Sequence, residues 1–352
     1  MQYLIVGQGL AGTMLAHQFL KTGKTFKIID PGVNESSRVA AGIMNPIVFR
    51  RVTKSWMVDQ CLSEAVRQYR ELEELLGVRF LFEREIRRAF SSEQEKEWWE
   101  QKSALEEFNG YIDSPGSATP PPTYLKAPFG NEMVHRVHYV ETKMFIDTNR
   151  SFFKEKGVLL EDTFDYDCIT DEGCLLDGIR FDKIIFCEGY QSRKNPFFSY
   201  LPVNATKGQI LDLEIPLVTN RSEVLNRKCF VLPLENGAFK AGATYEWDSP
   251  DTLITEVARK ELEEKIEGLL DVPFSVTGQE AGVRPTTDDR RPLLGCHPER
   301  DDLYFFNGLG TKGYLLAPYF AGEIFLRVTE NKPVLKDADL VRFAKRRNLK
   351  NS

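Results

Sequence analysis

Residues 3–12 have the sequence YLIVGQGLAG, in which a short apolar run passes directly into a glycine-rich turn. The apolar part is typical of a buried strand, and Leu10, Met14 and Phe19 follow at the spacing of one helix face. A second apolar run at 25–29 predicts another strand. The opening of the chain therefore predicts a strand, a glycine turn, a helix and a second strand.

The three glycines of this turn have separate physical roles. Gly7 permits the tight turn, Gly9 lets a pyrophosphate approach the backbone, and Gly12 allows the helix to pack closely on the strand. The unpaired N–H groups at the start of the helix, at Leu10 and Ala11, and its positive dipole end would hold the phosphates. These residues predict a phosphate-binding turn.

An acid ends the second predicted strand. Asp30 lies 18 residues beyond Gly12, a position where such an acid accepts hydrogen bonds from ribose hydroxyls. Pro31 follows, and no basic residue comes directly after it to hold a 2′-phosphate. We therefore predict an adenine dinucleotide site that includes Asp30 and Pro31, without separating FAD from NAD. A glycine-lined turn that binds no ligand is the alternative.

Length and composition are ordinary for a globular protein with two domains. The chain has 352 residues, 42% of them apolar and 28% charged. Its net charge of −6 argues against a broad nucleic-acid-binding surface, and the basic pair Arg346–Arg347 is more typical of a solvated tail. No apolar run is long enough for a membrane span, and no signal peptide is evident. We expect a cytoplasmic protein that does not bind nucleic acid, with a homo-oligomer left open.

Cysteines and histidines give little sign of a metal site. The six cysteines are Cys61, Cys168, Cys174, Cys187, Cys229 and Cys296, with no C-x-x-C pair among them. We expect buried, reduced thiols. His135 and His138 could share a helical face, but the residues around them predict a strand. No metal ion is therefore predicted.

Predicted strands and helices alternate, as they do in nucleotide-binding domains, in three separate parts of the chain. These parts are 1–50, 141–200 and 280–352, and the inserts 51–140 and 201–279 are richer in antiparallel strands. Helices are predicted at 54–77, 142–156 and 315–329, and buried strands at 183–187 and 303–306. The predicted fold class is mixed α/β, with a discontinuous Rossmann-like domain interleaved with a substrate domain on an antiparallel sheet. Most NAD dehydrogenases instead complete the nucleotide domain in one block.

Seven local motifs accompany this interleaving. In chain order they are VGQGLAG at 6–12, SSRVAAGIMNP at 36–46, IIFCEGYQS at 184–192, LPVNATKGQIL at 201–211, GATYE at 242–246, GVRPTTDDRRPLLG at 282–295 and GLGTKGYLLAP at 308–318. Their order and the interleaving resemble the D-amino-acid-oxidase superfamily of flavoproteins, particularly its glycine-oxidase-like branch. The resemblance covers most of the chain and implies FAD as the cofactor.

The resemblance also implies which residues contact FAD. One segment would wrap the pyrophosphate and run beneath the isoalloxazine, a glycine turn would close on the dinucleotide, and the start of the last long helix would face the N1–C2=O region of the flavin. These residues are Ser37, Arg38, Ala41 and Gly42, then Glu188 and Gly189, then Gly310, Thr311, Lys312, Gly313 and Tyr314. Lys312 would add a positive charge there, unless it faces solvent.

Arg284 is the residue that the resemblance assigns to the substrate. A guanidinium matches a planar carboxylate through two parallel hydrogen bonds. The alternative is a structural ion pair with Asp288 or Asp289. Tyr245 and Arg51 are weaker candidates for the same pocket.

Two departures from the family pattern bear on substrate and cofactor. Glycine-oxidase-like enzymes tend to carry Arg-Asn where this chain has Thr311 and Lys312. The form found here is closer to the oxidase that trims a carboxymethylaminomethyl group on a tRNA wobble uridine. Relatives resembling sarcosine oxidase hold FAD through a cysteine, but Cys296 stands in no matching motif. We therefore expect non-covalent FAD.

The resemblance implies an FAD-dependent oxidase or dehydrogenase that oxidises a C–N bond of an amino acid or secondary amine. Hydride would pass to flavin N5, and electrons would go on to O₂ or another acceptor. The alternatives are an oxidase acting on a carboxymethylaminomethyl-type tRNA base, an NAD-dependent Rossmann dehydrogenase, and a flavoprotein that only binds its ligand.

Overall fold

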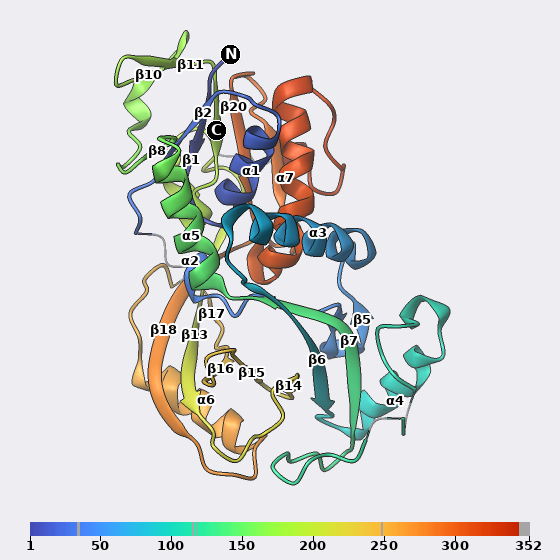
Figure 1. Ribbon diagram of the computed structural model, residues 1–352. Helices are drawn as coiled ribbons and strands as arrows, with labels where there is room; N and C mark the ends of the chain where they lie inside the picture. The colour runs from blue at the N-terminus through green and yellow to red at the C-terminus, as the bar shows by residue number, and fades with distance from the viewer. Residues whose placement is uncertain (34–35, 115, 118, 248, 345–352) are drawn as a thin grey trace.

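The computed structural model describes residues 1–33, 36–114, 116–117, 119–247 and 249–344. Arg346 and Arg347 lie outside this range. Two β-sheets organise the chain, one in the upper and one in the lower part of Figure 1, and the N-terminus lies in the upper part.

The upper sheet has six strands in the order β19-β20-β12-β1-β2-β8. Five of them run parallel and β19 runs antiparallel to β20. Their bounds are β1 Tyr3–Val6, β2 Phe26–Ile29, β8 Leu159–Leu160, β12 Lys183–Phe186, β19 Leu293–Cys296 and β20 Leu303–Asn307. The strands predicted near 3, 25, 183 and 303 are therefore confirmed as parts of one sheet, although they come from three parts of the chain.

Three long helices pack on the upper sheet and on one another. They are α1 Leu10–Lys21, α5 Thr142–Glu155 and α7 Gly313–Glu330. The Phe19 ring of α1 meets the Phe325 ring of α7 edge-on, with centroids 5.1 Å apart. On the other side of α1, His17 Nε2 lies within hydrogen-bond distance of Asn149 Oδ1 of α5, at 2.5 Å. The helices predicted at 142–156 and 315–329 are confirmed.

The lower sheet has nine strands, in the order β17-β13-β16-β15-β14-β6-β7-β3, with β18 also paired to β13. All neighbours run antiparallel except β14 and β6. The bounds are β3 Ile43–Met44, β6 Leu81–Ala89, β7 Asn131–Val140, β13 Asn204–Glu214, β14 Glu223–Asn226, β15 Phe230–Pro233, β16 Phe239–Gly242, β17 Glu246–Trp247 and β18 Ser275–Thr286. The boundary expected at residue 280 lies inside β18, because pairing with β13 continues to Thr286.

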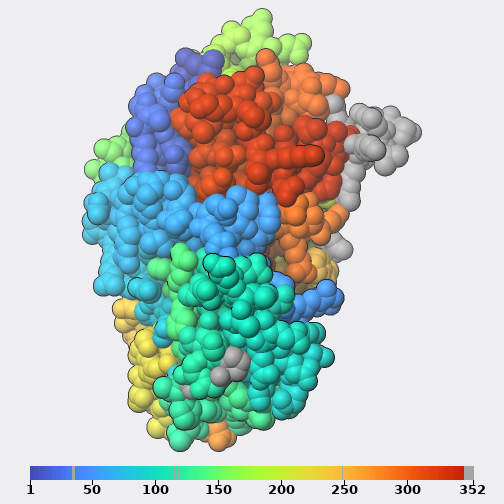
Figure 2. Space-filling model, turned by 90° about the vertical axis from the view of Figure 1, so that its right-hand side faces the viewer, coloured from blue at the N-terminus to red at the C-terminus, as the bar shows by residue number. Residues whose placement is uncertain are grey.

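Helix α3, Val58–Leu76, lies at the junction of the two halves. Figure 2 shows it crossing the middle of the molecule below α7. Gln68 Nε2 donates to Pro318 O at 2.9 Å, and Tyr69 OH donates to Tyr314 O at 3.0 Å. The helix ends at the predicted Gly77, which has φ +66°, a conformation that glycine adopts without strain.

The remaining elements lie around the two sheets. They are α2 Ser36–Val39, α4 Glu93–Ser103, α6 Glu256–Glu267, the pair β4 Ile47–Val48 and β5 Thr53–Lys54, and the small sheet of β9 Ile169–Thr170, β10 Gly173–Leu176 and β11 Ile179–Phe181. Short 3₁₀ turns join several of them. Within the described residues, no helix combines the length and apolar character needed to cross a bilayer.

The expectation that all six cysteines are reduced is wrong for one pair. Cys168 and Cys174 form a disulfide, while the other four cysteines are free. The tight turn between β9 and β10 brings the two Cα atoms to 5.1 Å, which is within disulfide range, so no C-x-x-C spacing is needed. His135 and His138 lie on strand β7, as predicted, and no metal-ligand cluster occurs within the described part of the chain.

Candidate active site

The glycine turn after β1 is as tight as the motif predicts. Gly7 has φ +102°, and a Cβ there would lie 2.6 Å from Cys187 O. A Cβ on Gly12 would lie 1.9 Å from Gly7 O, so α1 packs directly against the turn. Gly9 begins α1 without a side-chain cap. Larger residues at positions 7 and 12 would push the helix away from the strand.

The segment from α2 to Gly42 contacts both halves of the molecule. Ser36 Oγ donates to Val283 O at 2.6 Å, and Tyr314 OH donates to Ser37 O at 2.7 Å. Ser37 Oγ accepts the first N–H of α1, from Leu10, at 3.0 Å. Gly42 has φ +72°, and a Cβ there would lie 2.1 Å from a β7 carbonyl. These contacts bring the segment against the start of α1.

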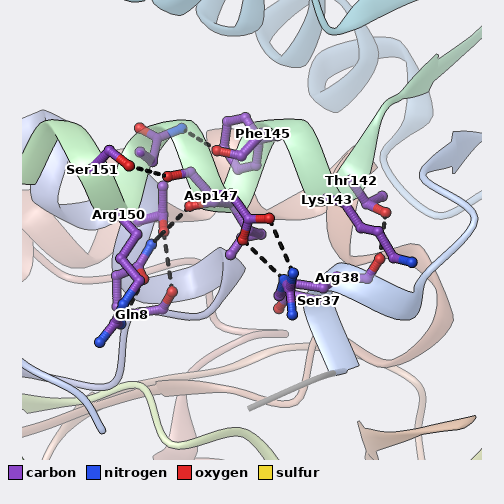
Figure 3. A network of polar contacts seen from close by, with 12 residues as sticks. Gln8, Ser37, Arg38, Thr142, Lys143, Phe145, Asp147, Arg150 and Ser151 are labelled. Carbon is purple, nitrogen blue, oxygen red and sulfur yellow. Dashed lines mark hydrogen bonds and ion pairs between the residues drawn. The ribbon is translucent and has the colours of Figure 1, made fainter. Parts of the chain in front are cut away.

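Asp30 is buried and held by several donors. Its Oδ2 accepts the Gln8 N–H at 2.7 Å, and its Oδ1 accepts the Gly32 N–H at 2.7 Å and pairs with Arg150 at 2.9 Å. Figure 3 shows Arg150 of α5 reaching Gln8, and Arg38 paired with Asp147 of the same helix. Gln8, Asp30, Arg38 and Arg150 line a hollow of about 440 Å³.

A second cavity, of about 360 Å³, lies between the two sheets.

 Both sheets and the segments between them contribute residues to its wall. The upper half supplies Gly9, Leu10, Ala11, Ser37, Ala41, Gly42, Cys187, Gly189, Asn307 and the run Gly310–Tyr314. The lower half supplies Ile86, Gly208, Ile210, Val224, Asn226, Phe230, Tyr245 and Arg284.

Most of the predicted site residues therefore line this cavity. Several others lie outside its wall. Gly7 and Gly12 shape the turn behind the wall, and Pro31 is exposed. The carboxyl group of Glu188 accepts hydrogen bonds from Tyr166 OH and Asn195 Nδ2, and burial raises its pKa. Arg51 is exposed and outside the wall.

Arg284, on β18, has its guanidinium in the cavity wall. Nη1 donates to Thr244 O at 3.4 Å, and Cζ lies 5.0 Å from the ring centroid of Tyr245. Burial lowers the pKa of the guanidinium, which still stays cationic at neutral pH. Within the described residues no carboxylate pairs with it.

Arg284 does not form the alternative ion pair with Asp288 or Asp289. Asp289 instead pairs with Arg342 at 2.9 Å, and Asp288 Oδ1 accepts from Asn204 Nδ2 at 2.8 Å. A partly buried cation without an anionic partner is costly. The Arg284 guanidinium is thus able to bind an anion that enters the cavity.

Lys312 supplies the second positive charge of the wall. It ends the 3₁₀ turn Gly310–Lys312 that leads into α7, and its Nζ donates to Asn45 O at 2.9 Å. Burial lowers its pKa to about 8. Among the described residues that line the cavity, Arg284 and Lys312 are the charged ones, so the wall carries two cations and no carboxylate.

Sequence reasoning missed Asn307 and Gly208. Asn307 ends β20, and its Nδ2 donates to Gly189 O at 2.8 Å and to Ser192 Oγ at 3.0 Å. This amide joins the two turns that flank the cavity, and its position just before the glycine turn at 308 was a usable signal. Gly208 was visible only as a glycine within a predicted strand, a known sign of close approach.

The family model of FAD-dependent oxidoreductases designated DAO matches residues 2–325. This chain belongs to that family. It is therefore an FAD-dependent oxidoreductase, and the NAD-dependent alternative is set aside.

Individual relatives are distant. The glycine oxidase of Bacillus licheniformis is 23% identical over 94% of this chain and 93% of that protein. The tRNA-modifying bifunctional protein MnmC of Idiomarina loihiensis is 30% identical, but over 39% of this chain and 23% of that protein. The crystal structure of glycine oxidase from Geobacillus kaustophilus has a TM-score of 0.79 at 19% identity, covering 97% of both chains. This last likeness establishes the fold.

The residues of the cavity fit FAD. Gly9 contributes no side chain at the start of α1, where a diphosphate would approach the backbone. A Cβ on Gly313, at the start of α7, would lie 3.0 Å from Leu10, so the starts of α1 and α7 lie side by side in the wall. Two positive helix ends and Lys312 match a cofactor that carries negative charge at both places.

Proposed function

We propose that this enzyme oxidises the C–N bond of a carboxylate-bearing amine, either an amino acid or a secondary amine. The observation that carries the proposal is the Arg284 guanidinium, which lies in the cavity wall without a carboxylate partner in the described structure. Its fork of N–H groups matches a planar carboxylate. FAD, when bound, would supply the electron acceptor for the C–H bond next to nitrogen.

The charges of the wall also favour the reactive protonation state of the amine. Hydride can leave the carbon only when the nitrogen has a free electron pair. The amine must therefore either bind in its neutral form or lose a proton to solvent after it binds. Arg284 and Lys312 disfavour an ammonium, and no carboxylate of the wall stabilises one. Binding would therefore lower the amine pKa, and no catalytic base is required.

Non-covalent binding of FAD is part of the proposal. Cys296 lies outside the cavity wall, with its Sγ 3.5 Å from Arg300 O. Cys187 is in the wall but beside Gly7, at the phosphate end, and burial raises the pKa of its thiol well above the ordinary value. A thiol held protonated is a poor nucleophile. We expect denaturation to release all of the flavin.

A second candidate acts on a carboxymethylaminomethyl group of a modified tRNA base. It is favoured by the partial match to MnmC, and such a group is itself a secondary amine with a carboxylate. The net charge of −6 argues against it. A gel shift with tRNA that weakens steeply as salt increases would support this candidate, and no binding at low salt would remove it.

The central experiment is anaerobic reduction of the bound flavin by a panel of amino acids and N-alkyl amino acids, followed at 450 nm. At least one amine is expected to bleach the flavin. Arg284→Ala should then raise KM for that amine by tenfold or more. An unchanged KM would remove Arg284 from the substrate site, and a flavin that no amine bleaches would contradict the proposed activity.

A further inference from the structure

The face of the lower sheet that closes the cavity is apolar next to Arg284. One row of residues crosses four adjacent strands in register: Ile210 on β13, Gly242 on β16, Phe230 on β15 and Asn226 on β14. Residues directly opposite each other on neighbouring strands point to the same face. Ile210, Phe230 and Asn226 accordingly all line the cavity.

A second pair extends this apolar floor. Val224 of β14 lies opposite Ile86 of β6, and both line the cavity. Their exposed fractions are 0% and 1%, so neither side chain is open to bulk water. Four apolar side chains from four strands thus form one floor, made of Ile86, Ile210, Val224 and Phe230.

Glycines lie between Arg284 and this floor. Gly208, beneath the guanidinium, is paired with Gly282, and both line the cavity. At Gly242 a Cβ would lie 2.7 Å from Ile210 Cγ2 and 3.2 Å from Phe230 Cζ, so the absence of a side chain there lets Ile210 and Phe230 approach each other as one apolar surface. Neighbouring strands are about 4.8 Å apart, so β15 lies about 10 Å from the strand that carries Gly208.

The far end of the floor carries a polar group that is already fixed. Asn226 Oδ1 accepts from Arg88 Nη1 at 2.5 Å, and Arg88 is itself paired with Glu95 at 2.7 Å. No charged side chain belongs to this part of the wall. The floor therefore matches an uncharged substituent and would leave a charged one unpaired.

We propose that the substrate carries, besides its carboxylate, a bulky apolar substituent that crosses Gly242 and packs on Ile210, Phe230, Val224 and Ile86. The enzyme would therefore prefer amino acids or N-alkyl amino acids with such a substituent over glycine. The inference rests on the proposed function, since it assigns the carboxylate to Arg284. A substrate as small as glycine would leave this floor in contact with trapped water or empty space, and each methylene buried there should tighten binding about fourfold.

The test uses the purified enzyme with FAD bound and the unreactive carboxylates acetate, butyrate and hexanoate. Their dissociation constants are measured from the change that each produces in the flavin absorption spectrum. Hexanoate is expected to bind at least tenfold more tightly than acetate. Equal affinity for the three carboxylates in the wild-type enzyme would overturn the inference.

Two neighbouring residues on β15 supply matched variants. Phe230→Ala removes part of the floor and should reduce the advantage of hexanoate over acetate several-fold. Val231→Ala truncates the next residue, which lies in the core behind the opposite face of the sheet, and should leave that ratio unchanged. Equal effects of the two variants would contradict the inference.

Turnover separates this inference from the proposed function. Leucine and N-butylglycine distinguish a substituent on the α-carbon from one on nitrogen, and either should give a kcat/KM at least tenfold above that of glycine. If glycine is the best of the three, the inference fails while the proposed function stands. If no amine reduces the flavin, the proposed function fails, and the carboxylate series still decides whether the apolar floor binds.

Discussion

The guanidinium of Arg284 lies so close to the backbone of Gly208 that a Cβ at residue 208 would be 2.0 Å from its Nη2. The two residues are on neighbouring strands, β18 and β13, and Gly208 itself pairs with Gly282. The absence of a side chain at 208 therefore sets where the cation of the cavity lies.

We expect Gly208→Ala to move this guanidinium and to raise KM for a carboxylate substrate tenfold or more, with a smaller effect on kcat. The matched control is Gly322→Ala on α7, where a Cβ would meet nothing within 4 Å. That change should leave KM unaltered and, at a helix interior, stabilise by up to about 1 kcal/mol. Steady-state kinetics and the flavin spectrum check both, and an unaltered KM in Gly208→Ala would show that the contact has no bearing on binding.

Arg150 holds the buried carboxylate of Asp30. Arg150→Met removes the cation of this pair, and we expect it to lower the free energy of unfolding by about 1–3 kcal/mol and to weaken FAD binding. Lys154→Ala, on the same helix, breaks an exposed ion pair with Glu161 and should cost less than about 1 kcal/mol. Urea unfolding and FAD titration of the two apoproteins measure the difference. Equal, small effects would mean that the pair does not hold Asp30.

His17 should make the enzyme less stable in mild acid. Burial lowers its pKa to about 4, against an ordinary value of 6.5, so the unfolded chain binds a proton that the folded chain does not. This contribution to stability is complete above pH 6.5 and is lost as the pH falls toward 4, by up to about 3 kcal/mol. Urea unfolding at pH 7, 5.5 and 4 should show a loss that His17→Gln partly abolishes. An NMR titration with a His17 midpoint near 6.5 would contradict the assignment.

Lys312 should make bound FAD easier to reduce, because its charge lies at the start of α7, where the flavin ring is expected. We predict a lower reduction potential in Lys312→Met and a near-normal one in Lys312→Arg, measured by dye-linked titration at pH 7. The pKa of about 8 means that the charge is lost as the pH rises through that value, so wild type and Lys312→Met should converge at pH 9.5. A constant difference across this range would exclude the charge as its cause.

Local pattern determined several features of this protein by itself. The glycines at 7, 9 and 12, the apolar strands and the three long helices followed from spacing and residue type, because turns and amphipathic helices depend on near neighbours. The interleaving of two kinds of strand–helix pattern was also visible, and the family resemblance that it supports implied FAD.

Only the tertiary structure decided what happens between distant segments. It brought Arg284 over Gly208, turned Arg38 and Glu188 to partners away from the cavity, and joined Cys168 to Cys174. It also aligned Ile210, Gly242 and Phe230 into one row. The physical reason is register: which side chains meet across a sheet depends on how strands far apart in sequence are paired, and a shift of one residue would reverse every face.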